Sequence, residues 1–159
     1  MPRFRYIARL LCALLVGAGL FACSGEDCPI NNVVQGKLAF YNQHGESVSY
    51  ADSLTVRVVR PQGDSVVLNR KVYASEVLFP LSYVHGTDTL IFDYSGGRVP
   101  DSLFISHTNR PTLVSVDCGT AMFHTITSVS STHHYIDTLV IKSSDVNYDE
   151  RENIQVIYR

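Results

Sequence analysis

A recurring triplet, Asp followed by Ser or Thr and then by an aliphatic residue, most constrains how this chain can fold. It occurs five times, at Asp52-Ser53-Leu54, Asp64-Ser65-Val66, Asp88-Thr89-Leu90, Asp101-Ser102-Leu103 and Asp137-Thr138-Leu139. The copies lie 12, 24, 13 and 36 residues apart, close to multiples of one strand plus one turn in an antiparallel β protein. Asp accepts hydrogen bonds from backbone N–H groups where a turn ends. Each triplet is therefore predicted to open a strand, with its Ser or Thr facing solvent and its aliphatic residue entering the core.

The residues that follow these triplets alternate between apolar and polar, most clearly over 53–58 and 89–94, which predicts strands with one buried face. In residues 23–159, Val, Ile and Thr number 18, 8 and 10, whereas Ala, Glu, Lys and Met together number 13. Because β-branched side chains favour strands and no long window keeps helical spacing, we expect no helix.

These patterns predict an all-β domain with nine strands and a tenth at 153–158. The turns are expected at His44-Gly45, 61–64, 95–97, Asn109-Arg110-Pro111 and Cys118-Gly119. A single antiparallel β-sandwich, immunoglobulin-like or similar, accommodates this order, and a closed β-barrel is the alternative. The nine strands are expected near 33–41, 52–59, 64–69, 77–83, 88–94, 101–107, 112–118, 121–129 and 136–142.

Residues 1–22 have the features of an export signal. Three arginines precede an apolar run over residues 10–20, which is shorter than the roughly 20 apolar residues of a membrane-spanning helix. We therefore expect a signal peptide at 1–22, a tether at 23–30 and the β-sandwich domain at 31–159.

The residues Leu20-Phe21-Ala22-Cys23 resemble a bacterial lipobox, although Phe21 is larger than the residue usually found there. The resemblance implies a lipoprotein with diacylglyceryl and palmitate on Cys23, anchored to the outer membrane at its periplasmic face or at the cell surface. Ordinary cleavage near Ala22 is the alternative. The segment 24–27 resembles the acidic sorting stretch of surface lipoproteins in Bacteroidetes-type bacteria, with a solvated spacer as its alternative.

Removal of the signal leaves an acidic chain, because residues 23–159 hold 10 basic and 15 acidic side chains, a net charge of −5. Phosphate backbones would repel such a surface, so nucleic acid is not an expected partner. Attachment to the membrane is expected through the acyl chains alone.

Two cysteines, Cys28 and Cys118, remain after Cys12 leaves with the signal and Cys23 is acylated. Two thiols outside the cytoplasm usually pair, so we expect a structural disulfide between them. The alternative, a reactive thiol, requires a neighbouring base.

Several short segments together resemble a Bacteroidetes-type lipoprotein family of unknown function over residues 28–159. The resemblance implies an envelope location and the Cys28–Cys118 pairing, and it brings no catalytic or ligand residues. The segments are Cys28-Pro29, 40–42, 52–55, 79–81, 107–111, 115–119, 123–126 and 146–148.

Histidines and acidic residues offer no metal-site pattern. His107, His124, His133 and His134 lack the spacing of paired ligands, and a two-residue turn at Gly119-Thr120 would place Ser115 rather than His107 opposite His124 unless a bulge intervened. The segment 145–152 begins like a calcium loop but has Glu where Gly is needed. We expect no metal and no cofactor.

No motif of a hydrolase, metalloprotease or nucleotide-binding enzyme occurs in the chain. We therefore expect a non-enzymatic envelope lipoprotein, an assembly or interaction module with a protein or glycan partner. The alternative is a carbohydrate-binding module, which a solvent-exposed row drawn from Tyr41, Tyr50, Tyr73 and Tyr83 would indicate.

The five triplets also match the acceptor triplet for O-glycosylation of exported proteins in Bacteroidetes-type bacteria. The candidate acceptors all lie at positions expected to face solvent. The alternative is that the triplets serve only to begin strands. The acceptors are Ser53, Ser65, Thr89, Ser102 and Thr138.

Overall fold

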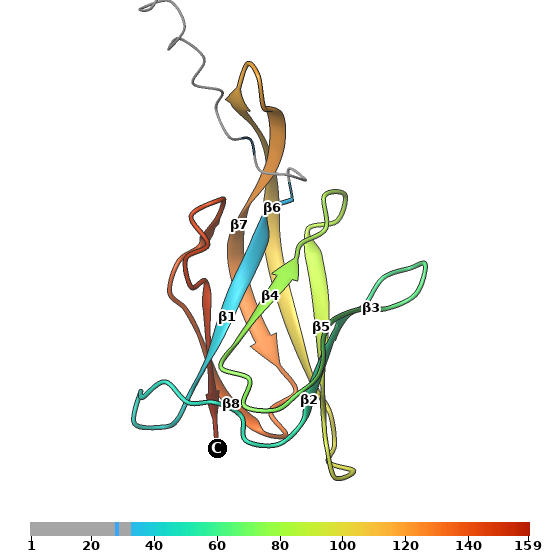
Figure 1. The fold of residues 1–159 in the computed structure, drawn as a ribbon, viewed down its shortest axis with the longest axis vertical. Helices are drawn as coiled ribbons and strands as arrows, with labels where there is room; N and C mark the ends of the chain where they lie inside the picture. Colours follow the sequence, from blue (N-terminus) through green and yellow to red (C-terminus); the bar gives the residue numbers. More distant parts are fainter. Residues whose placement is uncertain (1–27, 29–32) are drawn as a thin grey trace, which may run out of the picture.

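The structure, a computed structural model, describes Cys28 and residues 33–159. These residues form ten strands and no helix, arranged as two sheets packed face to face (Figure 1). The strands are β1 (Gln35–Tyr41), β2 (Leu54–Val58), β3 (Ser65–Lys71), β4 (Glu76–Pro80), β5 (Thr87–Tyr94), β6 (Asp101–Ser115), β7 (Gly119–Ser131), β8 (Ile136–Ile141), β9 (Asp145–Val146) and β10 (Ile154–Tyr158). Among these residues, no helix is long and apolar enough to cross a bilayer.

One sheet has the strand order β4-β1-β10-β8 and the other has β3-β2-β5-β6-β7-β9. The two sheets are separate, which confirms the predicted β-sandwich over the closed barrel. One pairing departs from the antiparallel expectation, because β1 and β10 are parallel, with Leu38 beside Ile154. Parallel neighbours need a long connection, and here the rest of the domain supplies it.

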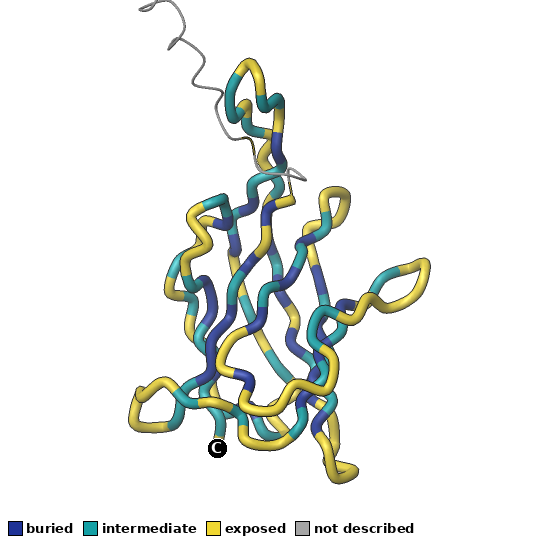
Figure 2. The backbone as a smooth tube through the Cα atoms, in the orientation of Figure 1, coloured by how far each residue is buried: buried dark blue, intermediate teal, exposed yellow. Residues whose placement is uncertain are grey.

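The core lies between the sheets, and Figure 2 shows buried positions alternating with more exposed ones along the strands. Leu54, Val56 and Val58 of β2 are fully buried, as are Leu90 and Phe92 of β5. The predicted alternation of these two strands is therefore confirmed. Complete burial of such side chains stabilises a fold by about 1.5–3 kcal/mol each, so these strands set the register of the larger sheet.

Gly36 of β1 permits a close approach within the smaller sheet. It pairs with Phe79 of β4, and a Cβ atom at position 36 would lie 2.5 Å from Cζ of the Phe79 ring. The ring fills the space above the glycine, a cross-strand arrangement that fixes register. The fully buried Phe79 thus joins the core at a position where a larger neighbour cannot fit.

The predicted turn at Asn109-Arg110-Pro111 is wrong, because β6 continues through it to Ser115. Proline is tolerated within a strand where one edge has no partner. That condition holds here: β6 pairs with β5 only as far as Ser106, whereas Pro111 pairs with Met122 of β7 alone. The consequence is a long β6–β7 hairpin that projects beyond the sandwich (Figure 1).

The Asp triplets lie at or next to strand starts, as predicted, but their buried members do more than end turns. Asp88 and Asp101 are 4% and 0% exposed and bind distant segments. Val66 departs from the prediction that the aliphatic residue of each triplet enters the core, because it lies on the edge strand β3 and is 55% exposed. An edge position leaves its side chain without a facing layer.

Candidate functional site

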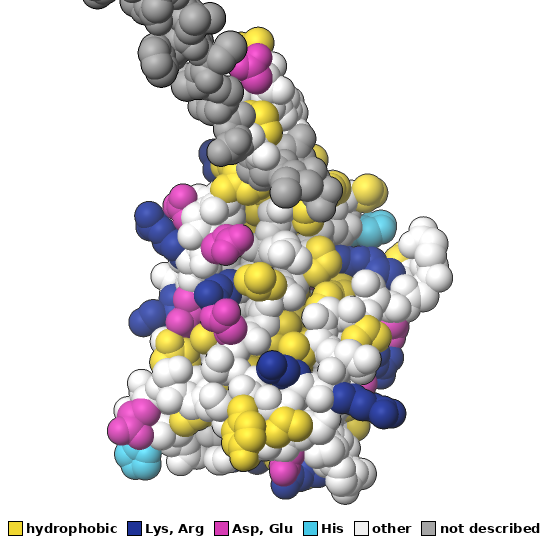
Figure 3. All heavy atoms as spheres, in the orientation of Figure 1, with side chains coloured by type: hydrophobic (Ala, Val, Ile, Leu, Met, Phe, Trp, Pro, Cys, Tyr) yellow, Lys and Arg dark blue, Asp and Glu magenta, His cyan; other side chains and the backbone are white. Residues whose placement is uncertain are grey.

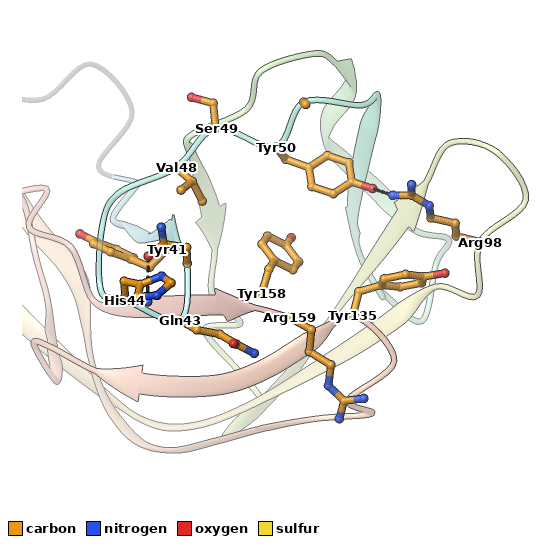
Figure 4. Close-up of a pocket in the computed structure, with 12 residues that line it drawn as sticks. Tyr41, Gln43, His44, Val48, Ser49, Tyr50, Arg98, Tyr135, Tyr158 and Arg159 are labelled. Carbon is orange, nitrogen blue, oxygen red and sulfur yellow. Dashed lines mark hydrogen bonds between the residues drawn. The ribbon is translucent and has the colours of Figure 1, made fainter.

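A hollow of about 390 Å³ at the end of the sandwich opposite the β6–β7 hairpin is the candidate binding site. Its volume falls in the range of small-molecule sites, roughly 300–1,000 Å³. Figure 4 shows Tyr50, Tyr135 and Tyr158 around this hollow, with Arg98 and Arg159 at its rim. We call it the tyrosine pocket. Its remaining lining residues are Tyr41, Asn42, Gln43, His44, Val48, Ser49 and Ala51.

The loop after β1 forms one wall of the pocket, and Asn42 holds it in place. The Asn42 side-chain oxygen accepts hydrogen bonds from the backbone N–H groups of His44 and Glu46, both at 3.0 Å. Further along, the Tyr50 N–H donates to the Ala74 carbonyl at 2.7 Å. The loop is thus fixed at both ends, a preorganisation that lowers the entropic cost of binding.

Tyrosine rings form the apolar floor of the pocket. The Tyr50 centroid lies 5.4 Å from that of Tyr94 and 5.6 Å from that of Tyr158, and Tyr94 lies 5.1 Å from Tyr135. Burial raises the pKa of Tyr94, Tyr158 and Tyr50, the last against the opposing effect of Arg98. The hydroxyls are therefore neutral groups that can both donate and accept hydrogen bonds.

Both arginines of the pocket have carboxylate neighbours. Arg98 donates to the Tyr50 hydroxyl at 2.7 Å and lies 3.2 Å from Asp52, while Arg159 lies 3.5 Å from Asp137. Their charge is thus largely compensated. The pocket offers aromatic faces, hydroxyls and amides rather than a net positive field, which suits a neutral, hydroxyl-rich ligand better than an anion.

Asp101 positions Tyr135 from beneath the pocket. Its carboxylate accepts hydrogen bonds from the backbone N–H groups of His134 (2.7 Å), Tyr135 (2.8 Å) and Ile136 (3.1 Å). It also accepts from the Tyr94 hydroxyl at 3.1 Å. Burial acts to raise the pKa of Asp101, but the backbone hydrogen bonds outweigh it and the pKa lies below its usual value. The ionised carboxylate therefore fixes the turn that carries Tyr135.

A second polar cluster lies near the base of the β6–β7 hairpin and is buried. Nε2 of His107 lies 2.9 Å from the Asp88 carboxylate, which also binds Arg60 and accepts from the Ser82 N–H at 2.7 Å. These contacts join the β4–β5 loop to β5, β6 and the segment that follows β2. Because the His107 and Asp88 side chains are 0% and 1% exposed, the cluster is suited to holding the fold rather than to meeting a substrate.

His124 meets this cluster, contrary to the expectation that His107 and His124 would not come together. A three-residue turn at 116–118 and a register shift between Leu113 and Ser115 replace the expected two-residue turn, so that Asn109 lies opposite His124. The Asn109 amide nitrogen donates to the His85 carbonyl, which leaves its oxygen to accept from Nδ1 of His124 at 2.8 Å. Within Cys28 and residues 33–159, no three His, Cys, Asp or Glu side chains are arranged to hold a metal ion.

Comparison with protein families gives one match, to a family of unknown function, DUF6452, over residues 53–158. The chain belongs to this family. No curated protein and no solved structure matches it. The DUF6452 match includes the Asp101 contacts, the polar cluster around His107 and Asp88, Arg98, Tyr135 and Cys118. It is shorter than the expected 28–159 and leaves out β1 and the loop wall of the pocket.

The structure of this DUF6452 member contains the Cys28–Cys118 disulfide, with Cα atoms 5.3 Å apart. It joins the start of the described chain to the tip of the β6–β7 hairpin. The lipid site Cys23 lies outside the described residues, as does the signal peptide.

The four tyrosines proposed as an exposed row do not form one. Tyr41 and Tyr50 both line the pocket, whereas Tyr73 lies between β3 and β4 and is 69% exposed. Tyr83 lies in the β4–β5 loop, where its ring stacks on His124 at 5.8 Å. The sequence offered no signal for Tyr135, Tyr158 or Arg98, because only the fold brings these residues to Tyr50.

Proposed function

We propose that the protein is a non-enzymatic lipoprotein of the cell envelope, held at the outer membrane through Cys23, that binds a neutral saccharide in the tyrosine pocket. The observation that carries the ligand class is the pocket itself, which combines tyrosine faces with neutral hydroxyl and amide groups and charge-compensated arginines. Sugars present apolar C–H faces and many hydroxyls, and aromatic rings with a polar end fit both.

The pocket favours saccharide binding over a purely protein-mediated role in envelope assembly. A flat platform for a long glycan would need coplanar, exposed aromatics. The half-buried tyrosines around the hollow suit instead a short saccharide or the end of a glycan chain.

Binding of neutral mono- and oligosaccharides, followed by calorimetry or by NMR titration, tests this proposal. Tyr50→Ala and Tyr135→Ala should each weaken binding about tenfold, since an aromatic contact of this kind contributes up to about 1.5 kcal/mol beyond its buried area. Tyr73→Ala is the matched control, because Tyr73 lies outside the pocket, and it should bind like the parent. Absence of any saccharide binding, or an equal loss with Tyr73→Ala, would contradict the ligand assignment.

Membrane attachment is tested separately. Cys23→Ser should move the protein from the membrane and detergent phases to the aqueous phase, because the acyl chains are lost. Retention of Cys23→Ser with membranes would show that Cys23 is not the anchor. Protease digestion of intact cells distinguishes the cell surface from the periplasmic face.

A further inference from the structure

The tip of the β6–β7 hairpin exposes apolar side chains beyond the body of the sandwich. We define the hairpin tip as residues 112–120. Val116 in its turn is 93% exposed and Leu113 is 67% exposed, and Figure 3 shows hydrophobic side chains along the projecting hairpin. Neither side chain contributes to the core, so both are free to contact a partner surface.

The disulfide brings this tip to the proposed anchor. Cys118 lies in the tip and is bonded to Cys28. Cys28 lies five positions after Cys23, and a fully extended chain over five residue steps spans about 18 Å. If Cys23 carries lipid, as proposed above, Cys28 must stay within that distance of Cys23, and the disulfide holds the Cα atom of Cys118 a further 5.3 Å away at most.

The tip is also placed to orient the domain. The β6–β7 hairpin and the tyrosine pocket lie at opposite ends of the long axis of the molecule (Figure 1). With the tip against the bilayer, the pocket opening lies at the far end from the lipid. An anchor through acyl chains alone would leave the domain free to tilt, whereas a second contact restricts it.

We propose that the hairpin tip is a lipid-contacting surface, with Val116 and Leu113 inserted among the headgroups and upper acyl chains of the membrane that holds Cys23. This proposal rests on the lipidation of Cys23. The chemistry that recognises the partner is apolar, because the tip holds one charged side chain, Asp117, and Arg110 just before the tip balances it. Binding is therefore expected to depend little on anionic lipid.

A tryptophan introduced at the tip reports on this contact, since the chain has no Trp of its own. The lipidated full-length mature protein with Val116→Trp is placed in vesicles of phosphatidylethanolamine and phosphatidylglycerol, with and without bromine on the acyl chains. We expect a blue-shifted emission that the brominated lipid quenches strongly. Ser95→Trp, in the exposed loop before β6 at the pocket end, is the matched control and should keep a water-like, unquenched emission.

Because tryptophan itself prefers interfaces, the native sequence is tested by hydrogen exchange. Amides of the hairpin tip should exchange more slowly on vesicles than in the Cys23→Ser protein in solution, and amides of residues 95–100 should not change. Flotation of the vesicles reports the anchor independently. Protein that floats but shows unquenched emission from the Val116→Trp variant and unchanged exchange overturns the tip contact and leaves lipidation intact. Equal quenching in the two tryptophan variants overturns it as well, and failure to float overturns both proposals.

Discussion

The ring of His107 meets the ring of His124 edge to face between β6 and β7, with centroids 5.2 Å apart. His107 has a carboxylate partner in Asp88, whereas His124 contacts the neutral Asn109 and the ring of Tyr83. Burial, and next the neighbouring His107, lower the pKa of His124 to about 4, and Asp88 opposes the shift only in part. A proton on His124 is therefore costly to the fold.

Acidification should weaken the fold through His124. The unfolded chain takes up this proton below its ordinary pKa of about 6.5, whereas the folded chain does so only near 4. The free energy of unfolding should thus be highest above about pH 6.5 and fall as the pH drops towards 4, by at most about 3 kcal/mol from this group. Urea unfolding at a series of pH values measures the slope.

His124→Gln should be less stable at neutral pH but should show a shallower decline over the same range. His44→Gln is the matched control, because His44 is exposed, and its profile should follow the parent. An unchanged slope in His124→Gln would assign the acid sensitivity of the fold to groups other than His124.

Strand β6 shows which parts of this fold the sequence predicts and which parts it does not. The alternation around 101–107 correctly indicated a strand, but Asn109-Arg110-Pro111 has turn composition and was predicted to end it. Turn residues are local signals. Whether Pro111 breaks a strand depends on whether both edges of that strand pair with neighbouring strands, and only the tertiary structure decides this. The meeting of His107 and His124 depends on a different turn, which lies at 116–118 rather than at Gly119-Thr120 and so changes the register of β7 against β6.

The pocket was beyond sequence reasoning for a related reason. Tyr50, Arg98, Tyr135 and Tyr158 come from four separate segments, and no periodicity connects them. The disulfide, in contrast, followed from the count of available thiols and the expected compartment, which need no knowledge of the fold.

Asp101→Asn should destabilise the protein by about 3 kcal/mol. An amide has one acceptor oxygen, and its N–H₂ group would face backbone donors now bound by the carboxylate, so buried N–H groups lose their partner. Asp137→Asn is the control: Asp137 lies 3.5 Å from Arg159 near the surface, and its loss should change stability by less than about 0.5 kcal/mol. Chemical denaturation at pH 7 compares the two, and equal effects would contradict the role given to Asp101.

Gly36→Ala should destabilise the smaller sheet by about 1–3 kcal/mol, because its Cβ would overlap the Phe79 ring. Phe79→Leu removes the overlap but leaves a gap in the core. The double variant should therefore be more stable than the sum of the two single losses indicates, a coupling that a double-mutant cycle measures. Additive losses would mean that the ring moves aside at little cost.

Substitution of either cysteine should destabilise the domain by a similar amount, because each substitution removes the same disulfide. The Cys28–Cys118 bond spans 90 residues, for which chain entropy gives an upper value of about 4–5 kcal/mol. Cys28→Ser and Cys118→Ser should lower the melting temperature by similar amounts, and the double variant should be no worse than either. Two free thiols in the denatured protein without reductant would refute the pairing.

Glycosylation of the Asp triplets should follow exposure in the folded sheet. Ser65 and Thr138 are exposed on the edge strands β3 and β8, whereas Thr89 and Ser102 are half-buried on the inner strands β5 and β6. A transferase acting on the folded domain needs its acceptor on an accessible strand, so we expect glycan on Ser65 and Thr138 first.

Intact-mass measurement of the native protein should show mass beyond polypeptide and lipid. Ser65→Ala and Thr138→Ala should each remove one increment, and Thr89→Ala, the matched control, should remove none. A native mass explained by polypeptide and lipid alone would leave strand entry as the sole role of the triplets.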